Sequence, residues 1–187
     1  MEAEIERRFR EYEHKPLAWD PIKGGKKAFI CFNDSLTAGI GEDLTGQRFE
    51  IIANRMLSGT YYPMDAVEFF GRFQDEGRNI RPGDRVLQRA RLLPFLKKIF
   101  VWSMVEIYVA ERREDFCQIG YVTTTQHHGR GIWTATLTKE DGELELTIES
   151  IASPNSWLFW IGLPFARFLQ LRARRRGIEE MASQIPA

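Results

Sequence analysis

The stretch GIWTATLTKEDGELELTIESIA, residues 131–152, is typical of two β-strands joined by a tight turn. Both halves are rich in β-branched and apolar residues, and Asp141-Gly142 between them is a strong signal for a two-residue hairpin. Residues 84–93, 101–112 and 116–126 have the same strand-like character. Five strands that follow one another through short connections predict an antiparallel meander.

Helical patterns stand on either side of these strands. Residues 42–59 carry apolar residues at the spacing of one helix face, and residues 64–73 are a second, shorter helical candidate. Residues 26–32 predict a first strand. After Ser153-Pro154, residues 155–181 predict a long closing helix that an internal proline kinks or divides.

This order of elements predicts an α+β fold of the helix-grip type, in which a curved antiparallel sheet surrounds a long C-terminal helix. A length of 187 residues indicates one domain. We expect residues 1–25 to be a peripheral N-terminal segment and residues 26–182 to form the domain. A sheet that curves around a helix often leaves a space beside it, and apolar spaces of this kind are where small molecules usually bind.

Composition narrows the function classes. The 26 basic and 26 acidic residues balance, so there is no overall electrostatic attraction to nucleic acid, and no nucleic-acid partner is expected. Cys31 and Cys117 are far apart and the N-terminus is charged, which argues against a disulfide framework and a secretory signal. No apolar run reaches the roughly 18 residues of a membrane-spanning helix. We expect a soluble, cytoplasmic protein with reduced thiols.

The segment GYVTTTQHHGRGIW, residues 120–133, holds two of the three histidines. Adjacent residues of an extended strand point to opposite faces, so His127 and His128 cannot hold one metal ion unless the chain turns there. Zinc also needs three or four ligands, and no Cys/His cluster supplies the others. We therefore expect no metal and no cofactor.

Two interpretations of these histidines remain open. In the first, they belong to a polar hairpin tip, with Gly129 and Gly131 in turn conformations. In the second, His127 faces the space between sheet and helix and forms a hydrogen bond with a polar ligand group. Tyr121, Thr123 and Thr125 share one strand face, which includes His127 if the strand continues that far.

Motifs of catalysis are missing from the sequence. There is no GxSxG nucleophile motif, and no glycine-rich phosphate-binding loop follows a predicted strand. Neither cysteine has a sequence neighbour that would activate it. The sequence therefore assigns no catalytic residue.

The second half of the chain resembles the uncharacterised family called domain of unknown function 1990. The shared features are an aromatic residue, Thr, His and Gly in a β-hairpin, a Ser-Pro pair, and a Pro-x-Ala-Arg-x-Leu-Gln segment in the last helix. The family prefers glycine and glutamate at two positions where this chain has Val122 and Ile132. The matching residues are Tyr121, Thr123, His127, Gly131, Ser153, Pro154, Pro164, Ala166, Arg167, Leu169 and Gln170.

The resemblance implies a START-like or Bet v 1-like domain that binds a small, mainly apolar molecule. It implies no established reaction. We expect the ligand to lie against Tyr121, Thr123 and His127 of the hairpin and against Arg167 and Gln170 of the last helix, where Arg167 could pair with a carboxylate. As an alternative, His127 acts as an acid or base on the bound molecule.

The last helix offers a third function. Its first half is apolar almost all round, and its second half is rich in arginine, a combination that suits a membrane surface or a protein partner. The same pattern fits a helix that the sheet covers at one end and water surrounds at the other. The residues for a membrane or partner contact are Trp157, Trp160, Arg172, Arg174, Arg175 and Arg176.

Overall fold

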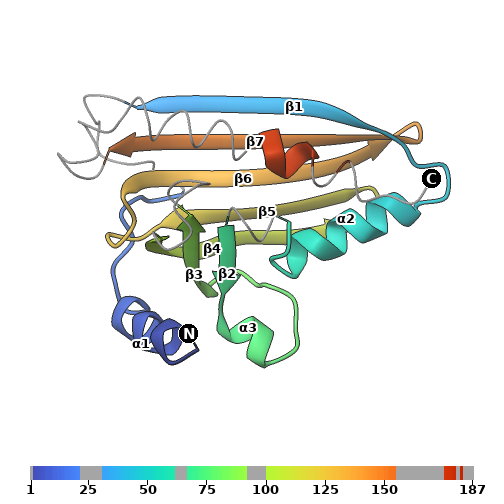
Figure 1. Cartoon of the computed structure of the whole chain (residues 1–187). Helices are drawn as coiled ribbons and strands as arrows, with labels where there is room; N and C mark the ends of the chain where they lie inside the picture. The colour runs from blue at the N-terminus through green and yellow to red at the C-terminus, as the bar shows by residue number, and fades with distance from the viewer. Residues whose placement is uncertain are drawn as a thin grey trace.

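The computed structural model describes residues 2–21, 31–61, 67–91, 100–154, 175–179 and 182. Its centre is a curved, fully antiparallel seven-stranded sheet in the order β1-β7-β6-β5-β4-β3-β2 (Figure 1). Three helices are described as elements beside it. The bounds are α1 Glu2–Tyr12, β1 Phe32–Glu42, α2 Gln47–Leu57, β2 Val67–Phe70, α3 Arg72–Asp75, β3 Arg85–Arg91, β4 Phe100–Arg113, β5 Phe116–Thr123, β6 Gly129–Glu140 and β7 Glu143–Pro154.

The predicted meander is confirmed, because β3 to β7 follow one another as antiparallel neighbours. The β6–β7 hairpin turns at Asp141 and Gly142, whose φ angles of 50° and 83° are both positive. Such angles match the right-handed twist of the flanking strands, which is why this dipeptide favours a two-residue turn.

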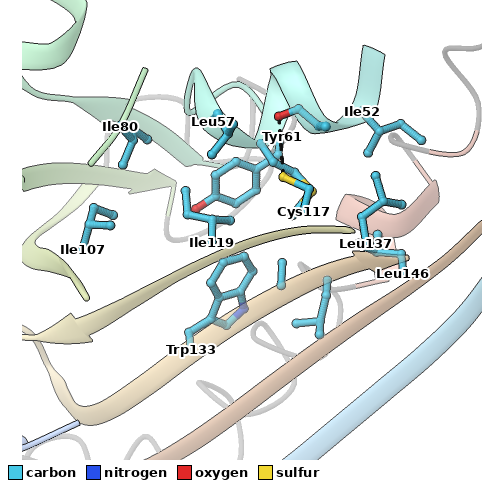
Figure 2. Close-up of a cluster of buried hydrophobic side chains, with 14 of the residues drawn as sticks. Ile52, Leu57, Tyr61, Ile80, Ile107, Cys117, Ile119, Trp133, Leu137 and Leu146 are labelled. Atoms are coloured by element: carbon cyan, nitrogen blue, oxygen red, sulfur yellow. Dashed lines mark hydrogen bonds between the residues drawn. The ribbon is translucent and has the colours of Figure 1, made fainter. Parts of the chain in front are cut away.

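The sheet has an inner face, which carries α2 and the main hydrophobic core. The core residues of α2 and the segment after it are Phe49, Ile52, Ala53, Met56, Leu57 and Tyr61, and Figure 2 shows the Tyr61 ring between α2 and Trp133. The sheet contributes Ile40, Phe69, Val86, Val105, Ile107, Cys117, Ile119, Trp133, Ala135, Leu137, Leu144, Leu146 and Ile148.

The outer face of the sheet carries α1. Phe9 and Tyr12 of this helix are buried against Leu87 of β3 and Met104 of β4, which forms a second, smaller core. Residues 2–21 therefore contact the sheet directly. The division of the chain at residue 25 stays a prediction.

One local prediction needs correction. Residues 67–70, inside the second helical candidate, form strand β2, and only Arg72–Asp75 are helical. Pairing with β3 at the sheet edge outweighs the local helical pattern, because Phe69 and Phe70 then lie on opposite faces of the sheet. The predicted strand of residues 26–32 lies mostly outside the described ranges, and the first described strand, β1, begins at its last residue, Phe32, and continues to Glu42.

The predicted long closing helix is not shown. Most of it lies in residues 155–174, outside the described ranges, and the structure describes a helical turn at residues 175–179. Ile178 of this turn is buried in the main core. The curved antiparallel sheet of the helix-grip prediction is therefore present, whereas its central helix stays a prediction.

Candidate functional site

The β5–β6 connection differs from the extended strand that the sequence suggested. Strand β5 ends at Thr123, and residues 124–128 form a turn in which the His127 N–H donates to the Thr124 carbonyl at 3.0 Å. Because the strand does not continue, Thr125 and His127 do not share a strand face with Tyr121, and Thr125 is exposed. The expectation of one polar stripe was wrong from residue 124 onward.

The His127 imidazole is bonded to the backbone of the same turn. Its Nδ1 lies 2.7 Å from the Gly129 carbonyl oxygen and 3.0 Å from the Gly129 backbone nitrogen. Burial and the nearby charge of His128 lower the pKa of His127 to about 4, and the bond with Gly129 opposes them only in part. His127 is therefore neutral at pH 7.

The two histidines lie in different environments. His128 is exposed, whereas His127 is partly buried. Within the part of the chain that the structure describes, no three His, Cys, Asp or Glu side chains gather in a way that could hold a metal ion.

Thr123 joins the two strands of this hairpin. Its side chain is buried, and its hydroxyl oxygen accepts the Gly131 N–H at 2.8 Å and donates to the Gly131 carbonyl at 3.2 Å. A Cβ at Gly131 would lie 1.8 Å from the Ile151 carbonyl oxygen, so only glycine fits here. Gly129 and Gly131 belong to β6, and the prediction that both take turn conformations was wrong.

Tyr121 belongs to a row of aromatic rings on the inner face. It stacks on Trp133 with ring centroids 5.2 Å apart, and Trp133 stacks on Tyr61 at 5.5 Å. Tyr61 in turn contacts Phe69 at 5.1 Å. The row crosses the inner face from β5 and β6 to β2.

Polar groups lie beside this row at positions that the sequence analysis did not select. Asp34 pairs with Ser150, Ser150 with Trp133, and Trp133 with Tyr121, so the four residues cross the inner face side by side. Ser150 is buried, and Asp34 Oδ2 and Trp133 Nε1 are shielded from solvent. The sequence does contain a signal for Ser150. Leu144, Leu146 and Ile148 are the inward-facing residues of β7, and Ser150, the next inward-facing residue, is polar.

A second buried polar pair lies on the same face. Ser103 Oγ donates to Gln88 Oε1 at 3.3 Å, and the two side chains are each only 5% exposed. The inner face thus has two parts. Near Cys117 it is apolar and contacts α2, where Cys117 Sγ lies 3.9 Å from the Ala53 carbonyl (Figure 2), whereas toward the β5–β6 turn it combines aromatic rings with polar groups.

The structure brings some of the predicted site residues together. Tyr121 and Thr123 lie on the inner face, and His127 lies in the turn just beyond β5. Arg167 and Gln170 are outside the described ranges, as are Trp157, Trp160, Arg172 and Arg174. Arg175 is exposed and Arg176 is partly buried.

The fold is shared with solved structures. A hypothetical protein from Helicobacter pylori aligns with a TM-score of 0.56 and 9% identity over 88% of this chain and 90% of its own. Major latex-like protein 151 from Panax ginseng aligns with a TM-score of 0.51 and 12% identity over 83% of this chain and 99% of its own. Ara h 8.0201 aligns with a TM-score of 0.51 and 12% identity over 82% of this chain and 95% of its own. At these identities the likeness concerns the fold alone, and it agrees with the Bet v 1-like fold that the family resemblance implied.

The family can be stated as well. The model of "Domain of unknown function (DUF1990)" matches residues 33–180, so the chain belongs to that family, as the hairpin motif indicated. None of the curated proteins matches the chain. Among the described residues, no helix is long and apolar enough to cross a membrane.

Proposed function

We propose that this protein binds a small, mainly apolar molecule on the part of the inner face that lies between α2 and the β5–β6 turn. The observation that carries the proposal is the aromatic row beside buried polar groups. Sites for small molecules are typically lined by apolar and aromatic side chains with a few polar groups that orient the ligand. The proposal includes the expected closing helix from residue 155, with Arg167 and Gln170 on the opposite side of the ligand.

Each part of the surface has a distinct role in this proposal. The rings of Tyr121 and Trp133 offer a flat apolar wall. Asp34 and Ser150, which lie beside Trp133 on the neighbouring strands, offer a carboxylate and a hydroxyl to a polar group of the ligand. Thr123 acts indirectly, because its hydroxyl is already bonded to Gly131 and fixes the strands that carry the wall.

Binding is favoured over catalysis by the state of His127. A general acid or base works best when its pKa lies near the working pH, and the pKa of about 4 is far from neutrality. A neutral imidazole, by contrast, is suited to a hydrogen bond with a ligand.

Two measurements test the proposal. Native mass spectrometry of the purified protein would identify co-purifying molecules, and titration with the fluorescent apolar probe 8-anilino-1-naphthalenesulfonate would give a Kd. We expect Tyr121→Leu to raise this Kd about five- to tenfold, the range that an aromatic contact supplies.

The matched control is Tyr108→Leu. Tyr108 is also partly buried and lies on the neighbouring strand β4, but it is on the outer face, where its hydroxyl bonds to Thr134 Oγ1 at 2.5 Å. We expect its Kd to equal that of the wild type. Equal effects of the two substitutions, or a wild type that binds neither the probe nor any co-purifying molecule, would refute the proposal.

His127→Ala separates the ligand carrier from the enzyme. Weakened binding without any conversion of the bound molecule supports the carrier. Unchanged binding with lost conversion of a co-purifying molecule would show that the alternative, acid–base catalysis by His127, is correct.

A further inference from the structure

The N-terminal segment, residues 2–21, makes an unexpected contact with the β5–β6 turn. This segment precedes residue 33, where the family match begins. We infer that residues 16–18 act as an additional strand that fixes the turn carrying His127, so that the N-terminal segment controls the shape of this end of the inner face. The effect on binding rests on the function proposed above, whereas the effect on the turn does not.

The pairing is defined by two hydrogen bonds on either side of a β-bridge. The Ala18 N–H donates to the Thr123 carbonyl at 2.8 Å, and the Thr125 N–H donates to the Pro16 carbonyl at 2.9 Å. Leu17 and Thr124 form the antiparallel bridge between them. The contact lies where β5 ends, so the segment extends the hydrogen bonding of the strand by the residues that lead into the turn.

The same residues hold His127. Thr124 is fully buried, and its carbonyl accepts the His127 N–H at 3.0 Å. Its hydroxyl oxygen accepts the Gln126 N–H at 3.3 Å and donates to the Met104 carbonyl at 2.8 Å. Any shift of Thr124 is therefore passed to the backbone of the next three residues, and the strand formed by residues 16–18 opposes such a shift.

The segment is firmly attached at its other end. Phe9 and Tyr12 of α1 are 8% and 7% exposed in the outer core, and the Arg8 guanidinium lies 4.9 Å from the centre of the Trp102 ring. Between α1 and the bridge, Arg85 Nη1 donates to the Lys15 carbonyl at 2.8 Å. The outer face is thus connected, through residues 13–18, to the turn at the end of the inner face.

Ala18→Pro in the full chain tests this connection, because proline lacks the N–H that bonds to Thr123. Ala18→Ser keeps the N–H and is the matched control. We expect amide hydrogen exchange of residues 125–129 to become about five- to tenfold faster in Ala18→Pro only, as the loss of one hydrogen bond implies. The pKa of His127, followed by NMR, should rise from about 4 toward 6.5 as water enters the turn.

The outcomes are distinct. A folded Ala18→Pro protein with wild-type exchange and a wild-type His127 pKa would overturn the inference. If that variant does not fold, Phe9→Ala, which weakens the anchor without touching the bridge, is measured in the same way with the same criteria. A looser turn with an unchanged Kd for 8-anilino-1-naphthalenesulfonate would overturn the effect on binding alone. A wild type that binds no probe refutes the proposed function and leaves the exchange result decisive for the turn.

Discussion

Gly131→Ala should be among the most damaging single-methyl substitutions in this protein. The new Cβ would lie 1.8 Å from the Ile151 carbonyl oxygen and 2.9 Å from Ala152 Cα, both backbone atoms of the adjacent strand β7. Ordinary van der Waals contact of a Cβ begins at 3.4 Å, so β6 and β7 would have to separate by roughly 1.6 Å at this point. Backbone hydrogen bonds do not survive such a shift, because they are limited to about 3.2 Å between donor and acceptor.

The magnitude follows from what the shift disrupts. Loss of roughly two backbone hydrogen bonds between β6 and β7 beside Gly131 costs about 1 kcal/mol each. Inserting a methyl group where there is no space adds about 1–3 kcal/mol. We therefore expect the free energy of unfolding to fall by about 3–5 kcal/mol, a large part of the roughly 5–15 kcal/mol that holds a domain together.

Urea unfolding, followed by tryptophan fluorescence, measures this loss. Gly39→Ala in β1 is the control, since its Cβ position has no contact within 4 Å from the other described residues, and its unfolding free energy should stay within about 0.5 kcal/mol of the wild type. If Gly131→Ala unfolds at the same urea concentration as Gly39→Ala, the close approach of β6 and β7 at this residue is wrong.

Three further predictions concern titratable groups. The pKa of His127 is about 4 in the folded protein and about 6.5 when unfolded, so the unfolded chain takes up the proton first as the pH falls. His127 therefore contributes stability above pH 6.5 that is lost as the pH falls toward 4. His127→Gln should make the urea midpoint less dependent on pH across this window, and an unchanged pH dependence would contradict the burial of the ring. Burial raises the pKa of the Cys117 thiol to about 11, so a thiol reagent should modify only the exposed Cys31 in the native protein and both cysteines in urea. Rapid labelling of two thiols in the native protein would disprove this. Burial tends to raise the pKa of Asp43, but backbone N–H bonds, including one from Phe49 at 2.8 Å, lower it overall. In urea unfolding at pH 7, Asp43→Ala should therefore lower the free energy of unfolding by about 1 kcal/mol, and by less in acid, where the carboxylate is protonated. An equal loss at every pH would exclude a role for the charge.

The strands of the meander were predictable because each carries its own signal. Residues 143–152 alternate between the two faces, and Asp141-Gly142 needs no distant contact to favour a turn. Strand β2 was not predictable, since Val67–Phe70 depends on pairing with β3, and its four residues are too few for a pattern.

The candidate site was predicted only in part. Tyr121 and Thr123 were selected, and their place on the inner face follows from alternation along β5. Asp34 and Ser150 are more than a hundred positions apart in the chain, and only the β1–β7 register places them together. The turn that separates His127 from the strand depends on backbone bonds that the sequence of threonines does not reveal.

The antiparallel meander, its β6–β7 turn and the family motif in the hairpin could be predicted, because periodicity and turn chemistry act between near neighbours. The fold was needed to show which polar side chains meet on the inner face and that residues 16–18 pair with the end of β5. These contacts join segments that are distant along the chain. Their partners are chosen by strand register and by burial of the whole sheet, which no local pattern encodes.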